Sequence, residues 1–211
     1  DLERWTKVAI EKYPNGLPKP YSEDPTQWIF HGRPEKSDDP LQAVIARLLG
    51  YRWPTELDPD MELSGEAQEL VAKCDDLLSF VDEDGIACIP AVRGEDPAAD
   101  RVRELLAAAF GSEWSPIKEK ELITATGTNA NDLEDWLHNH FFDQHCKLFH
   151  HRPFVWHIWD GRKRDGFHAL VSYHKLAEGS GKGKKLLETL TYSYLGDWIA
   201  RQEDEAKRGV A

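Results

Sequence analysis

Residues 136–174 read WLHNHFFDQHCKLFHHRPFVWHIWDGRKRDGFHALVSYH, and this stretch decides the fold. Its first part carries apolar residues at helical spacing around most of the circumference, which predicts a buried helix. Apolar and polar residues then alternate over 153–159 and again over 167–173, which predicts two strands. The connection 160–166 has a glycine near each end and three cations between them. We therefore expect a β-hairpin with an exposed basic tip.

Two details of this stretch can be predicted more closely. Asn131, followed three residues later by Glu134, is typical of a capping box, so the helix is expected to begin there. On the first strand, Phe154, Trp156 and Ile158 are expected to point to one face of the sheet, with the residues between them on the other face.

The flanking segments are mostly helical. Helical spacing, with Pro or Ser at the start and Gly near the end, predicts helices near residues 39–50, 64–81 and 96–111. The apolar run at 84–90 is either a strand or a buried extended segment. Residues 179–183 are expected to form a flexible break before a last helix over about 184–205. The predicted fold class is α+β, mostly α-helical with a small antiparallel β-hairpin or sheet.

The chain is expected to contain an irregular arm and one domain. Residues 1–37 are rich in Pro and turn formers after a short helical start, and residues 38–211 are expected to form a single α+β accessory domain. The chain has 211 residues, opens at Asp1 and has Met61 as its only Met, so it is expected to be a fragment of a larger protein. No signal peptide, long apolar run or CxxC pair occurs, which favours a reduced, cytoplasmic setting and no membrane partner.

The charge is unevenly distributed. The net charge is −12, but residues 143–185 carry nine cations and four anions, or +5, so the remainder carries −12 − 5 = −17. An acidic body with one basic strip remains compatible with nucleic acid, although charge alone supports a solvated loop equally well. Charged hairpin tips also block association between sheet edges. The candidate DNA-contacting residues are Arg152, Arg162, Lys163 and Arg164 of the hairpin and Lys182, Lys184 and Lys185 of the glycine-rich segment.

Other constellations favour structural roles. Eight of the nine histidines fall between His138 and His174, but no HExxH and no Cys/His pair at finger spacing occurs, so we expect packed or interfacial histidines and no metal site. The acidic run 82–84 is expected to be solvated surface rather than a general acid/base pair. The segment 179–185 lacks the GxxxxGK[ST] spacing of a phosphate loop.

The segment from Trp136 to Trp156 resembles a signature of large adenine-specific DNA methyltransferases, as does its continuation through 160–174. In that family a helix ending in F-x-x-H-x-x-x-x-x-x-R-P runs into a strand with Trp, and a basic glycine turn with G-F-x-A-L-[IV]-x-x-H follows. The family includes the methyltransferases of the BREX and DISARM phage-defence systems and the type IIG restriction-methylases. The match covers residues 82–199 and is most specific in the hairpin. It implies the spacer and target-recognition region, C-terminal to the catalytic core.

The resemblance also implies what this chain does not do. The family's glycine-bearing S-adenosylmethionine loop and its Asn-Pro-Pro-Tyr/Phe motif, which grips a flipped adenine, are both absent from the sequence. The expected function is therefore a non-catalytic fragment without a cofactor of its own, whose parent uses S-adenosylmethionine to methylate adenine N6. Its expected partners are double-stranded DNA and the parent's catalytic domain. The alternatives are a spacer that contacts only protein and, third, an autonomous metal nuclease using the histidine cluster.

Overall fold

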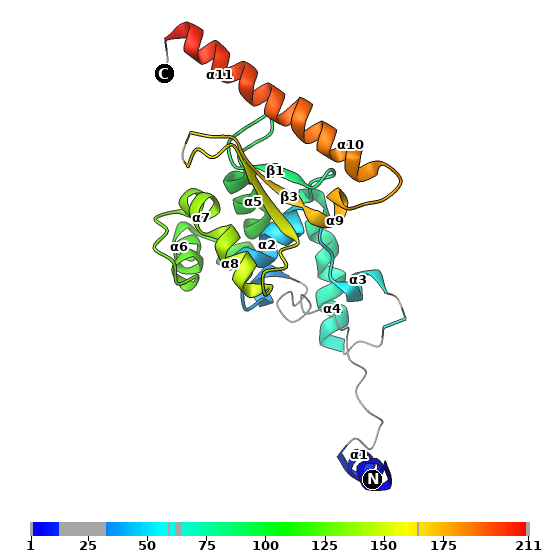
Figure 1. Cartoon of the computed structure of the whole chain (residues 1–211). Coiled ribbons are helices and arrows are strands. Elements are labelled where there is room, and N and C mark those ends of the chain that lie inside the picture. The colour runs from blue at the N-terminus through cyan, green and yellow to red at the C-terminus, as the bar shows by residue number, and fades with distance from the viewer. Residues whose placement is uncertain (1, 13–32, 59, 62–64, 164, 210–211) are drawn as a thin grey trace.

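The computed structural model describes residues 2–12, 33–58, 60–61, 65–163 and 165–209 (Figure 1). The fold is mostly helical with a small three-stranded antiparallel sheet, which confirms the predicted class. The α-helices are α1 (Leu2–Lys12), α2 (Pro40–Leu48), α3 (Pro54–Leu57), α4 (Gly65–Cys74), α5 (Ala98–Phe110), α6 (Pro116–Ala125), α7 (Leu133–Asn139), α8 (Phe141–Leu148), α9 (Tyr173–Leu176), α10 (Lys182–Glu188) and α11 (Gly196–Arg208). The other helical elements are the 3-10 segments η2 (Pro34–Lys36), η3 (Asp75–Phe80) and η4 (Gly111–Glu113) and the π-helical segment η5 (Thr189–Leu195).

Most of the predicted Pro-rich arm, residues 13–32, lies outside the described residues. The end of the arm, however, packs into the domain. Arg33 is only 7% exposed, and its guanidinium donates hydrogen bonds of 2.9 Å to the carbonyl oxygens of Lys73 and Ala109. The packed body therefore includes Arg33.

The sheet has the order β1-β3-β2, with β1 at Ile86–Cys88, β2 at Val155–Trp159 and β3 at His168–Ser172. β2 and β3 form the predicted hairpin, and the apolar run after residue 84 supplies the third strand. β3 is the central strand and is buried along its whole length, because it has a neighbour on each side and packed side chains on both faces.

Helices cover both faces of the sheet (Figure 1). Period-2 alternation sends Ala87 and Leu170 into a large core with α2, α5, α7 and α8, while Ile86 and Val171 point to the opposite face. There the C-terminal helix packs through a second, smaller cluster, which includes Leu190, Tyr194 and Trp198. The predicted face of Phe154 was wrong: it precedes β2 and packs in the larger core.

The helix that was predicted to begin at Asn131 is broken in two. His140 adopts φ −128° and ψ −34°, so α7 ends before it and α8 begins after it. The predicted cap at Asn131 is also displaced by one residue. Asp132 is the N-cap and accepts a 2.8 Å hydrogen bond from the N–H of Asp135, whose carboxylate reaches back to the N–H of Asn131. The exposed backbone N–H groups at the start of the helix are therefore capped by the carboxylate of Asp132 instead of the side chain of Asn131.

The expected flexible break before the last helix is wrong for Lys182 and Gly183. Helix α10 already begins at Lys182, and it runs without interruption through η5 into α11. Gly183 is buried against the end of α9, where a Cβ atom would lie 2.0 Å from the carbonyl oxygen of Leu176. Only glycine allows this close approach, so the segment is a tight junction.

A buried ion pair joins α2 to α3. Nη2 of Arg47 lies 2.6 Å from Oε1 of Glu56, and the two side chains are only 5% and 1% exposed. Oε1 of Glu56 also accepts the N–H of Trp53 at 2.7 Å. Nη2 of Arg47 lies 3.1 Å from Sγ of Cys74, and burial raises the pKa of that thiol to about 11.

Cys74 and Cys88 are buried and Cys146 is half-buried, and none of these three cysteines forms a disulfide. Within the described part of the chain, no helix is both long enough and apolar enough to cross a membrane.

Candidate functional site

The hairpin tip between β2 and β3 is folded tightly on itself. Asp160 accepts hydrogen bonds from the backbone N–H of Arg162 at 2.9 Å and from its guanidinium Nε and Nη2 at 2.9 and 2.8 Å. Gly166 packs under this turn, where a Cβ atom would lie 2.3 Å from Oδ1 of Asp160 and 2.6 Å from the carbonyl oxygen of Arg162. A glycine at this position is therefore required for the tip to close.

The structure separates the predicted DNA-contacting residues into two groups. Arg162 and Lys163 are exposed at the hairpin tip, and Arg164 lies outside the described residues. Arg152 precedes β2 and so lies at the other end of this strand, which spans about 17 Å for five residues. The remaining cations, Lys182, Lys184 and Lys185, lie on α10, which packs against α9 and is also remote from the tip (Figure 1).

Several of these cations have anionic neighbours. Arg162 pairs with Asp160, Lys182 with Glu178, and Lys184 with Glu188 at 3.8 Å. Lys163, Lys185 and Arg152 have no ion-pair partner among the residues that the structure describes, and all three are exposed. The free positive charge of the tip is therefore smaller than the sequence alone indicates.

Three histidines from separate elements meet beside the tip: His138 of α7, His157 of β2 and His168 of β3. The rings of His138 and His168 lie 4.5 Å apart, edge to face. Nε2 of His168 lies 2.7 Å from the carbonyl oxygen of Arg162, which can only accept, so this nitrogen carries the proton. With both rings neutral, Nδ1 of His168 then accepts from Nε2 of His157 at 2.9 Å. Nδ1 of His157 is consequently left as an acceptor.

A pocket of about 230 Å³ opens at this cluster. Its walls are the three histidines together with Asn139, Phe142, Asp143, Trp159 and Lys163. Trp159 is 46% exposed and its ring lies 5.5 Å from that of His168. Burial, reinforced by His168 and His138, lowers the pKa of His157 to about 4, so the ring of His157 is neutral at physiological pH.

Another histidine of this stretch, His145, lies in the core and has a structural role. It is fully buried, its Nε2 accepts the N–H groups of Phe154 at 3.3 Å and Val155 at 3.1 Å, and its Nδ1 donates to Oε1 of Gln42 at 2.9 Å. One ring therefore joins α8, the start of β2 and α2. Burial lowers the pKa of His145 to about 4, because the imidazolium would lose its acceptor role and its hydration.

Acidification is expected to destabilise the protein through these histidines. The pKa of His145 is about 4 in the folded state and about 6.5 in the unfolded chain, so below pH 6.5 the unfolded chain binds the extra proton. Full stability is present above pH 6.5. His145 alone is expected to remove about 1–2 kcal/mol between pH 6.5 and pH 5. Urea denaturation at both pH values measures this loss.

Further titratable groups affect the same measurement, among them His157 and Asp84. His157 acts with the same sign as His145, because its pKa is also lowered. Asp84 acts in the opposite direction. Its pKa is raised to about 6, so the folded protein takes up a proton there as the pH falls and gains stability relative to the unfolded chain. A free energy of unfolding that is unchanged or higher at pH 5 would contradict the dominance of the buried histidines.

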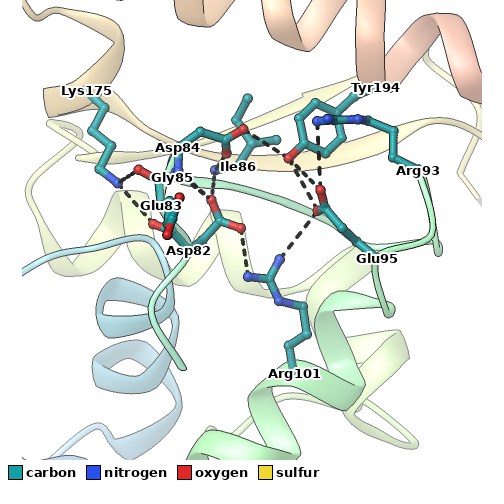
Figure 2. A network of polar contacts seen from close by, with 10 residues as sticks. All are labelled: Asp82, Glu83, Asp84, Gly85, Ile86, Arg93, Glu95, Arg101, Lys175 and Tyr194. Atoms are coloured by element: carbon teal, nitrogen blue, oxygen red, sulfur yellow. Dashed lines mark hydrogen bonds and ion pairs between the residues drawn. The ribbon is translucent and has the colours of Figure 1, made fainter. Parts of the chain in front are cut away.

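A second polar site lies where β1 begins (Figure 2). Oδ1 of Asp82 accepts the backbone N–H groups of Asp84, Gly85 and Ile86 at 3.1, 2.6 and 3.1 Å, and its Oδ2 accepts from Arg101 of α5 at 2.7 Å. The expectation that the acidic run 82–84 is solvated surface is therefore wrong for Asp82, which is only 8% exposed. Asp82 lies two residues before an Asp-Gly pair that precedes a buried strand, which is the chemistry of an Asx turn, and this local signal was available in the sequence.

The same network holds the C-terminal helix. The hydroxyl of Tyr194 lies 3.1 Å from Oδ2 of Asp84 and 3.0 Å from Oε1 of Glu95, and it has one proton for two carboxylates. Burial, reinforced by the hydrogen bond to Asp82 and its charge, raises the pKa of Asp84 to about 6. Burial disfavours the charged form of Asp82 and raises its pKa, but its hydrogen bonds and the ion pair with Arg101 outweigh this and hold the pKa below the ordinary value.

A polar cavity of about 560 Å³ borders this network. Its best-buried carboxylates are already bonded to backbone N–H groups, to Arg101 or to Tyr194, as Figure 2 shows. This arrangement fixes the loop before β1 to α5 and to the C-terminal helix, and we assign it a structural role. Within the described ranges, no group of three or more His, Cys, Asp or Glu side chains is arranged to hold a metal ion.

The pocket at the three histidines was not predicted. The sequence shows that His157 and Trp159 share a strand face, and the hairpin register places His168 opposite Trp159. The position of α7 against this face depends on tertiary packing and has no local signal. No protein-family model, curated protein or solved structure matches this chain.

Proposed function

We propose that this chain is a non-catalytic, DNA-contacting accessory region of an adenine-specific DNA methyltransferase of a restriction-modification or phage-defence system. The resemblance of residues 136–174 to the methyltransferase signature supports this choice of family. The parent protein would supply S-adenosylmethionine and the catalytic domain. In the structure, the residues of this stretch form one unit. His145 positions β2, while Gly166 and His168 hold the tip.

One observation carries the DNA contact. The closed tip presents Lys163 without an ion-pair partner in the described part of the chain, next to Arg162. Asp160 occupies Nε and Nη2 of Arg162, which leaves the Nη1 donors of the guanidinium for a phosphate. Phosphate contacts of this kind position a protein on DNA without reading its sequence.

The test is fluorescence anisotropy with a labelled duplex at low and moderate salt. Lys163→Ala is expected to weaken binding and to lower the slope of log K against log salt by about 1, because one phosphate contact is lost. Lys120→Ala is the matched control, since it removes one exposed positive charge from α6, away from the tip. Equal effects of the two variants, or no duplex binding by the wild-type chain, would overturn the proposed contact.

A second candidate function is a protein-interaction spacer that never contacts DNA. It is favoured by the ion pairing of Arg162, Lys182 and Lys184 and by the distance between the two groups of cations. For this candidate, a parent enzyme carrying Arg162→Ala and Lys163→Ala is expected to methylate DNA normally.

A further inference from the structure

The pocket at the three histidines adjoins the proposed phosphate-binding tip. Lys163 lines the pocket and also belongs to the tip, while His168 lines the pocket and bonds to the carbonyl oxygen of Arg162. A ligand in the pocket would therefore lie within reach of a group that binds phosphate. The volume of about 230 Å³ lies below the range of about 300–1,000 Å³ typical of drug-sized ligands. It fits a single ring system.

The walls of the pocket are aromatic. Trp159 leaves nearly half of its surface exposed, and the rings of His157 and His168 lie 6.3 and 5.5 Å from it. Phe142 from α8 stands edge-on to His157 at 6.2 Å. Walls of this kind bind a flat π-system by stacking, and they offer little to a flexible aliphatic chain.

Polar atoms lie along the same pocket. Among the described residues, the buried Nδ1 of His138 has no hydrogen-bond partner, although buried polar nitrogens normally have one. Nδ1 of His157 is an acceptor when both rings are neutral, and the Asn139 amide, whose Nδ2 already donates to Asp135 at 2.8 Å, keeps its oxygen and one N–H. The pocket thus offers donors and acceptors to the edge of a heterocycle.

Taken together, the geometry points to a site for a nucleobase. We propose that this pocket receives one unstacked, unpaired base of a DNA strand, stacked on Trp159, while Lys163 holds an adjacent phosphate. The proposal deepens the proposed function and rests on it, because it adds base binding to the contact with the DNA backbone. An inorganic anion alone is disfavoured, since Asp143 also lines the pocket and Lys163 is the single Lys or Arg among the described residues that line it.

The test compares a labelled single-stranded oligonucleotide with the duplex of the same sequence. Trp159→Ala is expected to weaken single-strand binding roughly 5- to 150-fold, which is the effect of losing one base–aromatic stack. Duplex binding, which depends on phosphate contacts, is expected to change less than twofold. Trp159→Phe retains an aromatic face and is expected to restore most of the single-strand affinity.

Trp156→Ala is the matched control. Trp156 lies three residues away on the same strand, is 44% exposed against 46% for Trp159, and occupies the opposite face of the sheet. It is expected to leave single-strand binding unchanged, and thermal melts of all variants test whether the fold is retained. Equal losses for Trp156→Ala and Trp159→Ala would overturn the pocket, as would unchanged single-strand binding by Trp159→Ala.

The failure of this inference can be distinguished from that of the proposed function. If duplex binding depends on Lys163 while Trp159→Ala has no effect on single strands, the DNA contact stands and the pocket proposal is wrong. If the wild-type chain binds no duplex but binds a single strand through Trp159, base binding stands and the proposed duplex contact is wrong. If neither DNA form binds, both proposals are wrong.

Discussion

Replacing His145 with Ala is expected to lower the free energy of unfolding by about 3–5 kcal/mol, measured by urea denaturation at pH 7.5. The ring is fully buried among Phe141, Phe149 and Phe154, so its removal leaves a cavity in the larger core. The substitution also removes the acceptor of the Val155 N–H at the start of β2 and the partner of Gln42 Oε1. The cavity and the unpaired polar groups both lower the free energy of unfolding.

His174→Ala is the control for this prediction, because it removes an exposed imidazole at the end of the same stretch. It is expected to change stability by less than about 1 kcal/mol. A loss below about 1.5 kcal/mol for His145→Ala would show that the core repacks around the site and that His145 does not anchor β2.

Arg47→Ala is expected to cost about 2–4 kcal/mol, because it leaves the buried carboxylate of Glu56 with only the longer, 3.5 Å ion pair to the partly exposed Arg52. The Glu56 side chain is only 1% exposed, so water cannot replace the guanidinium unless the structure opens. The same substitution also removes the contact of Nη2 with the buried Cys74 thiol. The measurement is again the urea denaturation midpoint, with the slope checked for a change in the exposed surface.

A double variant separates the charge from the packing. Arg47→Met with Glu56→Gln removes both charges, keeps the volume similar and retains an oxygen for the Trp53 N–H. It is expected to be clearly more stable than Arg47→Ala, since replacing a buried pair by neutral groups is often close to neutral in free energy. If the double variant is as unstable as the single one, lost packing rather than an unpaired charge is the cause.

Local patterns predicted most of the secondary structure. The alternation before and after the basic turn gave the correct strands and pairing, and prolines and glycines marked the ends of α2 and α5. These signals are local, because they depend on backbone preferences within a few residues. The break at His140 was missed, since Leu133, Trp136 and Phe141 are buried whether or not the helix is continuous.

The candidate site was less predictable, because its contacts are long-range. His145 meets Gln42 across 103 positions and Tyr194 meets Asp84 across 110. Nothing in the spacing of these residues indicates that they touch. The seven predicted cations were chosen by their proximity in the sequence, and the structure places the six described ones at the hairpin tip, before β2 and on α10.

The strand order has a consequence for how this chain can be divided. β3 pairs with β2 through a local hairpin, but its other edge is closed by β1, which lies about 80 residues earlier in the chain. Any fragment that starts after Cys88 would leave the buried, largely apolar β3 with an open edge, and such edges recruit strands from other molecules. The shortest soluble piece that carries the hairpin must therefore retain β1. Three residues far upstream protect the hairpin from aggregation.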